Sequence, residues 1–455
     1  MRVHFIAIGG SAMHNLAIAL HLKNYTVTGS DDEIFDPSRS RLEKHKLLPE
    51  KWGWFPEKIN ESIDAVILGM HARIDNPELL RAQELGLKIY SYPEYIYEQT
   101  KDKTRIVIGG SHGKTTTTSM VMHVLKENNI DFDYMVGAQI EGFDTMVKLT
   151  QEANIAIFEG DEYLSSPIDR RPKFHLYHPH IALLTGIAWD HINVFPTFEN
   201  YVEQFKIFTD LIQEKGSLIY FEEDEHIQKI IANKRGDISY LPYNTHPFQL
   251  VNNQSILQTN LGDFPLEIFG EHNLQNLMGA YYICKSIGLK DLDFYQSIQS
   301  FSGAARRLQK LAENDNCCVF QDFAHSPSKL KATTLAVKKQ YPQRKLIAIM
   351  ELHTFSSLKK EFLPQYKNTM KTADRAFVYF DPHTIAHKKL ELISSEQVAE
   401  AFGGDNLSVY TNSKKLISDL LSMNFMNTTV LLMSSGNFTG TNLASLAEKI
   451  IVSAK

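Results

Sequence analysis

The chain has 455 residues, of which 43% are hydrophobic and 22% are charged, and its formal net charge is −6. This length and balance predict a folded protein of two to four domains, and they argue against a nucleic-acid or membrane partner because no basic stripe or tail is present. The three cysteines are odd in number and two are adjacent, which argues against a disulfide framework and a zinc site and favours a reducing compartment. No apolar stretch approaches membrane-spanning length, so we expect a cytoplasmic protein.

The N-terminal segment predicts a Rossmann-like unit. A strand over residues 3–8 leads into a glycine turn, a helix to about Leu22 and a second strand over residues 25–28. A glycine turn at the start of a helix suits a phosphate group, and Asp31 follows the second strand, where an acidic residue can hold a ribose. The turn comprises Gly9, Gly10, Ser11, Ala12 and Met13.

The glycine fingerprint of dinucleotide-binding folds is incomplete in this turn, because Ala7, Gly9 and Ala12 occupy its three glycine positions. A nucleotide diphosphate is therefore as good a candidate as a dinucleotide, and a structural turn without a ligand is the third alternative. Strands over residues 65–68 and 88–91 continue the alternation, and the charged run over residues 98–103 predicts a linker. We expect a first domain over residues 1–100.

The most informative stretch of the chain begins with the β-branched run 106–108, which predicts a buried parallel strand. A glycine turn then leads into a helix over residues 115–125, although Ile108 stands where the full Walker pattern has its first glycine. Backbone N–H groups at such a helix start bind phosphate, Lys114 can reach the β and γ phosphates, and Thr115 can offer a hydroxyl to Mg²⁺. The predicted phosphate loop comprises Gly110, Ser111, His112, Gly113, Lys114, Thr115 and Thr116.

Two later strands end in side chains that can hold a metal ion. The apolar run 155–158 is followed by Glu159, Asp161 and Glu162, and the run 181–184 precedes Asp190 and His191. Carboxyl ends of parallel strands meet in one crevice, so we expect these groups beside the phosphate loop, suited to Mg²⁺ on a nucleoside triphosphate. The alternative for each is a helix cap or a loop histidine.

The segment 270–276 opens an amphipathic helix, in which Asn273 or Asn276 could serve only as a cap. Paired arginines at 306 and 307 follow a small-residue hinge and could reach a phosphate or form a solvated surface pair. A third α/β domain is expected over residues 303–455, after a central domain over residues 104–302.

Four motifs now stand in order: the phosphate loop, the carboxylates with Asp190-His191, the segment 270–276, and Arg306-Arg307 followed by Asp322-Phe-Ala-His-Ser-Pro327. With the first glycine turn, this set resembles the Mur ligase family of ATP-dependent amide-forming enzymes over nearly the whole chain. The resemblance implies an α/β fold of three domains: a Rossmann-like UDP-sugar domain, a central ATP-binding domain and a C-terminal α/β domain that closes on ATP and binds the amino acid or peptide.

The resemblance also implies a role for each matching residue. Thr115, Glu159 and His191 would hold Mg²⁺, and the first glycine turn with Asp31 would hold the UDP portion of the substrate. The implied ATP contacts beyond the phosphate loop are His272, Asn273, Asn276, Arg306 and Asp322. The implied catalytic residues are Lys114, Glu159, His191, Arg306 and His325.

Within the family, two branches act on UDP-N-acetylmuramate through an acyl phosphate. One attaches L-alanine, and the other attaches the recycled peptide L-alanyl-γ-D-glutamyl-meso-diaminopimelate. Glu162-Tyr163, the segment 168–179 and the segment 433–438 look more like the peptide ligase, which is the function we expect, with the L-alanine ligase as the alternative. The chain departs from relatives at Gly186, where they tend to carry Asn, and lacks an arginine in the loop 351–357.

Two hypotheses of other classes compete with the ligase. A nucleotide- or UDP-sugar-binding regulator could keep the fold and lose catalysis, but the retained Lys114 and Glu159 argue against it. An oxidoreductase built on the first domain would leave the phosphate loop unexplained.

Overall fold

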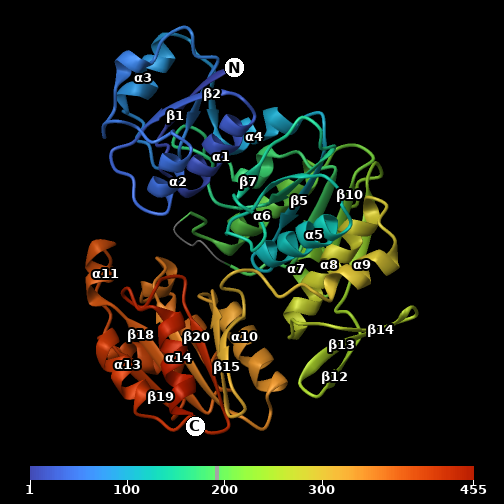
Figure 1. Ribbon diagram of the computed structural model, residues 1–455, viewed down its shortest axis with the longest axis vertical. Helices are drawn as coiled ribbons and strands as arrows, with labels where there is room; N and C mark the ends of the chain where they lie inside the picture. The colour runs from blue at the N-terminus through green and yellow to red at the C-terminus, as the bar shows by residue number, and fades with distance from the viewer. Residues whose placement is uncertain (190–193, 455) are drawn as a thin grey trace. The chain divides into compact units, whose positions relative to one another are not determined.

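The computed structural model describes residues 1–189 and 194–454 (Figure 1). Within these residues no helix is long and apolar enough to cross a bilayer. The described chain forms two compact units. Unit 1 comprises Met1–Ile187, Thr197–Asn244 and Gly279–Phe294, and unit 2 comprises the other described residues.

The first sheet of unit 1 has four parallel strands in the order β2-β1-β3-β4. The strands are β1 (Arg2–Ile6), β2 (Thr26–Ser30), β3 (Ala65–Leu68) and β4 (Ile89–Ser91). The helices are α1 (Ser11–Leu22), α2 (Ser38–Lys44), α3 (Pro77–Glu84) and α4 (Tyr92–Thr100). Every residue of β3 is buried, as expected for a parallel strand covered on both faces.

The predicted linker over residues 98–103 is wrong in its first half, because α4 continues to Thr100. A capping box between Ser91 and Glu94 fixes the start of this helix. Beyond its end, the buried Arg105 guanidinium donates to the carbonyl oxygens of several residues, which ties this connection to the second sheet. These residues are Thr100, Lys101, Lys103, Tyr177 and His178, at 2.7–3.2 Å.

The second sheet of unit 1 has seven strands in the order β11-β10-β9-β5-β8-β6-β7, and within it only β6 and β7 pair in antiparallel fashion. The strands are β5 (Thr104–Gly109), β6 (Asp133–Met135), β7 (Val147–Lys148), β8 (Ile155–Glu159), β9 (Ile181–Leu184), β10 (Ser217–Phe221) and β11 (Ser239–Tyr243). The helices are α5 (Lys114–Glu127), α6 (Phe198–Asp210) and α7 (Glu225–Ile230). Because β8 and β9 flank β5, their carboxyl ends lie beside the turn that starts α5.

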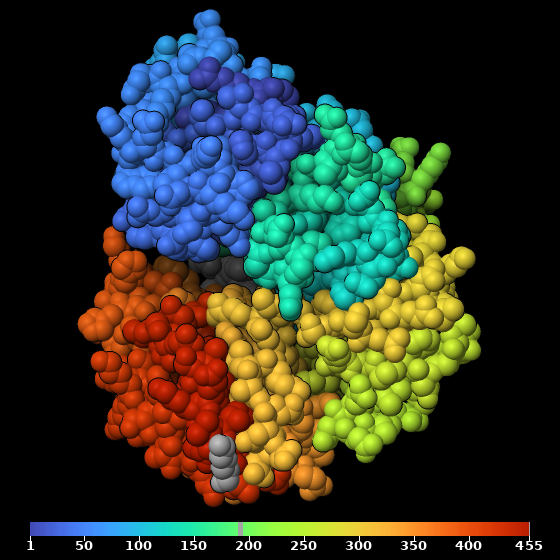
Figure 2. Space-filling view, in the orientation of Figure 1, coloured from blue at the N-terminus to red at the C-terminus, as the bar shows by residue number. Residues whose placement is uncertain are grey.

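The two sheets of unit 1 are joined by direct contacts. Helix α1 is buried along Met13–Leu20 because it packs on its own sheet and also against β7. Arg41 donates to the Gln139 side chain at 2.6 Å, and the Met146 N–H donates to the Asn15 side chain at 2.9 Å. In Figure 2 the blue surface of the first sheet meets the cyan surface of the second along a continuous seam.

Unit 2 contains two sheets. A small antiparallel sheet has the order β12-β13-β14, and a six-stranded sheet has the order β15-β16-β20-β17-β18-β19, in which only β15 runs antiparallel. The strands are β12 (Phe248–Val251), β13 (Gln254–Thr259), β14 (Gly262–Pro265), β15 (Gln309–Glu313), β16 (Cys317–Asp322), β17 (Lys345–Leu352), β18 (Arg375–Phe380), β19 (Leu407–Tyr410) and β20 (Thr428–Met433).

The remaining helices cover the two faces of the six-stranded sheet or lead back to unit 1 (Figure 1). They are α8 (Glu271–Ser286), α9 (Asp291–Ile298), α10 (Pro327–Gln340), α11 (Pro382–His387), α12 (Ser395–Phe402), α13 (Ser413–Leu421) and α14 (Leu443–Ser453). Alternate strand residues feed two separate cores, with Cys318 and Phe320 in one and Cys317 and Val319 in the other. The adjacent cysteines are therefore free thiols in the cores on opposite faces of the sheet, in agreement with the expectation of no disulfide.

Candidate functional site

The phosphate loop lies where the sequence predicts it, between β5 and α5. Gly110 and Gly113 have φ angles of +128° and +79°, and a Cβ atom at Gly110 would come within 2.1 Å of the Thr185 hydroxyl oxygen. Gly113 is the N-cap of α5 and supplies no side-chain cap, so the backbone N–H groups of the first turn are suited to an anionic ligand.

Lys114 is held by a carboxylate in the loop that follows β8. Its ammonium donates to the Glu162 carboxylate at 2.7 Å and to the Gly110 carbonyl at 2.6 Å. The side chains are 14% and 1% exposed for Lys114 and Glu162. Burial disfavours the lysine charge, but the carboxylates of Glu162 and Asp161 outweigh it and raise the pKa of Lys114. The ammonium therefore stays charged.

Thr115 and Glu159 form the part of the predicted metal set that the structure describes. The Thr115 hydroxyl donates to one carboxylate oxygen of Glu159 at 2.8 Å, and the Gly137 N–H donates to the other at 2.7 Å. Hydroxyl and carboxylate oxygens are hard ligands of the kind that Mg²⁺ prefers, so the donors fit that ion. Within residues 1–189 and 194–454, no group of three His, Cys, Asp or Glu side chains could hold a metal by itself. His191 and Asp190 lie outside the described residues.

A tyrosine that no sequence motif indicated completes the surroundings of Lys114. The Tyr201 hydroxyl, on α6, donates to Glu162 at 3.0 Å and lies 2.9 Å from the Ser111 hydroxyl. Its ring is fully buried. Glu162 is thus bonded by Lys114 on one oxygen and by Tyr201 on the other. The link joins residues far apart in sequence, and an amphipathic helix with one tyrosine carries no signal that could have found it.

Local contacts explain why glycine stands at position 186, where relatives tend to carry Asn. The φ of Gly186 is +141°, and a Cβ there would lie 3.2 Å from the His112 ring. Its carbonyl accepts the Ser111 N–H at 2.9 Å, and the Thr185 hydroxyl donates to the His112 carbonyl. The phosphate loop therefore rests on the backbone after β9, and glycine fits this position without strain. His112 and Thr116, predicted ATP contacts, both lie in this stretch of loop and first helical turn.

The first glycine turn is braced by the residue predicted to hold a ribose. The Asp31 carboxylate accepts the Gly9 N–H at 2.7 Å and the Asp32 N–H at 2.9 Å. A Cβ at Gly9 would lie 2.8 Å from Ile34 and 2.9 Å from Asp31. Burial raises the pKa of Asp31 to about 6, with the Gly9 N–H opposing the rise. Gly10 then caps α1 through its backbone alone, and Ser11, Ala12 and Met13 form the first turn.

The segment between β6 and β7 connects the surroundings of the two turns. At one end, the Gly137 N–H binds Glu159. At the other, Met146 binds Asn15 through its N–H and lies 3.9 Å from the Ser11 hydroxyl through its sulfur. The helix that begins at the first glycine turn is thereby linked to the carboxylate that faces Thr115.

The C-terminal residues predicted to contact ATP form a cluster of their own in unit 2. The Arg306 guanidinium donates to the carbonyls of Ser434 and Gly436 and lies over the Phe323 ring at 5.3 Å. The Asp322 carboxylate accepts the N–H groups of Leu308 and Ala324, at 2.6 and 2.7 Å. Asp322 therefore fixes the loops at the end of β16.

Two histidines and two asparagines that were predicted as ATP contacts or catalytic residues also fall in unit 2. His325 follows Asp322 and its Nδ1 lies 2.8 Å from the Phe323 carbonyl oxygen. Burial lowers the pKa of His272, and the nearby Asp322 carboxylate opposes this effect. The capping interpretation of Asn273 and Asn276 is wrong. Both lie inside α8, are 6% and 7% exposed, and the Asn273 amide donates to the Phe269 carbonyl at 2.8 Å.

Three family descriptions match consecutive parts of the chain. "Mur ligase family, catalytic domain" matches residues 2–104, "Mur ligase middle domain" matches residues 108–284, and "Mur ligase, glutamate ligase domain" matches residues 306–436. The chain is 30% identical over 431 residues to a UDP-N-acetylmuramate–L-alanine ligase of Lactobacillus delbrueckii subsp. bulgaricus, and the match covers 92% of each chain.

Two solved structures share the fold. A UDP-N-acetylmuramate–alanine ligase of Thermotoga maritima matches with a TM-score of 0.70 and 19% identity, covering 99% of this chain and 98% of that one. A murein peptide ligase of Psychrobacter arcticus matches with a TM-score of 0.67 and 22% identity, covering 99% of each. The expected α/β fold of three domains is confirmed. The chain belongs to the Mur ligase family, the ATP-dependent, ADP-forming ligases of peptidoglycan synthesis.

Proposed function

We propose that the chain joins UDP-N-acetylmuramate to L-alanine. The observation that carries this proposal is the 30% identity, over 92% of both chains, to a protein named for that reaction. The sequence favours the peptide ligase through Glu162-Tyr163 and the segments 168–179 and 433–438. The solved peptide ligase structure is only 22% identical to this chain, however, and this similarity supports the fold alone. The peptide ligase remains the second candidate.

The proposed division of labour follows three segments of the chain. Residues 1–100 bind the UDP-sugar, residues 104–302 bind ATP, and residues 303–455 bind the amino acid and contact ATP. Gly9, Gly10 and the first turn of α1 would hold the diphosphate through backbone N–H groups, in the manner of other helix starts. Because ATP and UDP-linked precursors are cytoplasmic metabolites, we also propose a cytoplasmic location.

The chemistry begins with an unreactive carboxylate. One oxygen of the lactoyl carboxylate would attack the γ-phosphorus of ATP, so that ADP leaves and an acyl phosphate forms. The amine of L-alanine then attacks the acyl carbon, its extra proton is lost, and inorganic phosphate leaves as the amide forms. Negative charge accumulates on phosphoryl oxygens in the first step, where a fixed cation stabilises it. Lys114 supplies that cation from the phosphate loop.

Glu162 gives Lys114 a second role. The Glu162 carboxylate accepts a hydrogen bond from the Lys114 ammonium, as a phosphate oxygen would. A bound nucleotide must therefore compete with this ion pair for the ammonium. Tyr201 retains Glu162 from the other side and would keep the carboxylate in place when the lysine turns to phosphate. The pair therefore keeps the loop ordered before the nucleotide arrives.

Magnesium is proposed on the donors that the structure describes. Thr115 and Glu159 would hold the ion, with His191 as the further ligand that the family pattern implies. The ion would neutralise charge on the phosphates. In the C-terminal domain, Arg306 and His325 are the proposed catalytic residues, and Asp322, His272, Asn273 and Asn276 are the proposed nucleotide contacts.

The test is phosphate release by the full chain with ATP, Mg²⁺ and UDP-N-acetylmuramate, comparing L-alanine with L-alanyl-γ-D-glutamyl-meso-diaminopimelate. We expect release with L-alanine. Release with the peptide alone would establish the second candidate. No release with either acceptor, from protein that binds both nucleotides, would favour a non-catalytic regulator.

A further inference from the structure

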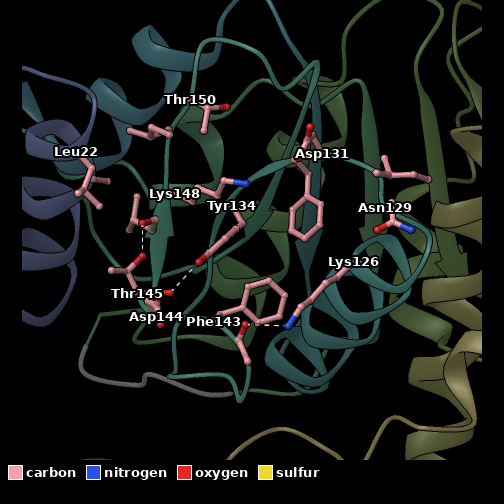
Figure 3. A pocket seen from close by; sticks show the side chains of 16 residues that line it. Leu22, Lys126, Asn129, Asp131, Tyr134, Phe143, Asp144, Thr145, Lys148 and Thr150 are labelled. Carbon is pink, nitrogen blue, oxygen red and sulfur yellow. Dashed lines mark hydrogen bonds between the residues drawn. The ribbon is translucent and has the colours of Figure 1, made fainter.

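A cavity of about 630 Å³ lies in unit 1, away from both glycine turns (Figure 3). Its walls come from the C-terminal ends of α1 and α5 and from the segments around β6 and β7. The lining includes Leu22, Lys126, Phe132, Tyr134, Phe143 and Lys148.

The position of the cavity separates it from the proposed substrate sites. Helices α1 and α5 each begin at a glycine turn and end at the cavity, at Leu22 and beside Lys126. Helices of 12 and 14 residues are about 18 and 21 Å long at 1.5 Å per residue. A molecule in the cavity would therefore not touch phosphate groups bound at either turn.

One wall of the cavity is aromatic. The Tyr134 ring lies 5.3 Å from Phe143 and 5.9 Å from Phe132, measured between ring centroids, and the two phenylalanine rings are 6.2 Å apart. The Tyr134 hydroxyl donates to the Thr145 carbonyl at 3.1 Å, which satisfies its polar atom and fixes the ring. Such a wall offers ring faces and edges to a flat aromatic molecule.

A cation lies beside this wall. The Lys148 ammonium is 5.9 Å from the centre of the Phe132 ring, and in the described part of the chain it forms no hydrogen bond or ion pair. Lys126 is different, because its ammonium is already bonded to the Gly142 carbonyl at 3.1 Å. In Figure 3, Lys148 lies to the left of Asp131 and above Asp144, and among the described residues no ion pair joins it to either aspartate.

We propose that this cavity binds a small aromatic carboxylate. The ring would pack against Phe132, Tyr134 and Phe143, and the carboxylate would accept a hydrogen bond from Lys148. The bound molecule would contact α1 of the first sheet and the edge of the second sheet together. This proposal does not depend on which amino acid or peptide the ligase uses.

The experiment is calorimetric titration of the full chain with 2-naphthoate, with its neutral amide as the comparison ligand. We expect one naphthoate per chain, bound equally well with and without a saturating non-hydrolysable ATP analogue. Lys148→Gln should weaken naphthoate about tenfold or more and leave the neutral amide unchanged, because a hydrogen bond to a charged group is lost. Lys88→Gln is the matched control, since Lys88 is exposed and is not part of the cavity lining.

A second variant tests the aromatic wall by placing an apolar but non-aromatic side chain in it. Phe143→Leu should weaken both naphthoate and the amide severalfold, because a ring contact is replaced by an aliphatic one. The proposal is overturned by absence of saturable binding at millimolar naphthoate, by displacement with the ATP analogue, or by equal affinity in the Lys148→Gln and Lys88→Gln proteins.

Discussion

The two glycine turns of unit 1 start similar helices but hold their anion-binding groups differently. At the first turn, Asp31 accepts the Gly9 N–H, and residues 8–13 include no lysine or arginine. At the second, Lys114 is paired with Glu162 and the Thr115 hydroxyl donates to Glu159. At each turn, a carboxylate of the chain accepts a hydrogen bond from a donor that could otherwise bind phosphate.

The difference indicates two kinds of phosphate chemistry on one architecture. Backbone N–H groups and a helix start are sufficient to bind a diphosphate that stays intact. A phosphate that is transferred gains charge in the transition state, and a fixed cation is most effective there. The second turn has that cation, so we expect substitutions there to affect turnover and substitutions at the first turn to affect affinity.

The largest expected effect follows from removing the cation. Lys114→Ala should lower turnover by about a thousandfold, as loss of a fixed charge in phosphoryl transfer does. The same change leaves the buried Glu162 carboxylate without its lysine, which should lower the free energy of unfolding by about 3 kcal/mol. Steady-state kinetics and denaturant unfolding measure the two effects.

The double variant Lys114→Ala/Glu162→Gln separates those effects. It removes the uncompensated buried charge, so stability should return toward that of the parent while turnover stays low. If turnover also recovered, the lysine would be a structural partner of Glu162 only, and the contrast between the two turns would be lost.

A smaller effect is expected at the carboxylate that faces Thr115. Glu159→Gln keeps the shape and can still accept the Gly137 N–H, but it weakens the ligand for Mg²⁺. Turnover should fall by about a hundredfold, and the Mg²⁺ concentration for half-maximal rate should rise. Glu203→Gln is a suitable control because Glu203 is a half-exposed residue of α6 in a surface ion pair. An unchanged Mg²⁺ requirement in the Glu159 variant would argue against the metal assignment.

At the first turn the expected effect is on affinity. In Gly9→Ala the new Cβ would come within 2.9 Å of Asp31 and Ile34, so the turn must shift. The KM for UDP-N-acetylmuramate should rise about tenfold, whereas the KM for ATP and the turnover at saturation should change little. A rise in the KM for ATP alone would reverse the assignment of the two turns.

The smallest effect is a pH dependence at Asp31. The folded-state pKa of about 6 lies above the ordinary value of 3.8, so the folded protein binds the proton more tightly than the unfolded chain. The resulting stabilisation is complete below 3.8 and is lost as pH rises through about 6. Asp31→Asn cannot titrate. The unfolding free energy of the parent relative to this variant should therefore fall as the pH rises through that window, and a constant difference would contradict the buried-carboxylate assignment.

Features with a local cause could be predicted from the sequence. The strand, glycine turn and helix around Lys114 depend on neighbouring residues, and the expected helix over 115–125 became α5 (Lys114–Glu127). The position of Glu159 beside the phosphate loop could also be predicted, because Glu159 ends β8 and the carboxyl ends of neighbouring parallel strands lie at one edge of the sheet. Glu159 lies against Thr115 as that geometry requires.

Features with a distant cause could not be predicted. The bond from Tyr201 to Glu162 depends on the packing of α6, which no local pattern indicates. The sheet of β12, β13 and β14 was missed because its strands are largely exposed and lack the apolar runs of the other sheets. The run over residues 98–103 looked like a linker because its charges are near one another in sequence, while the guanidinium that organises it comes from the following strand.

The buried Arg105 limits how far the family's parts are interchangeable. The match to the first family domain ends at residue 104 and the match to the middle domain begins at residue 108. This gap suggests a natural crossover point for building chimeras. Arg105 lies in that gap, and its guanidinium binds carbonyls on both sides of it. A recombinant that exchanges the first domain would therefore need to inherit the end of α4 and Arg105 from the same parent. The apparent domain boundary is therefore a place where hydrogen bonds of one side chain hold the two domains together.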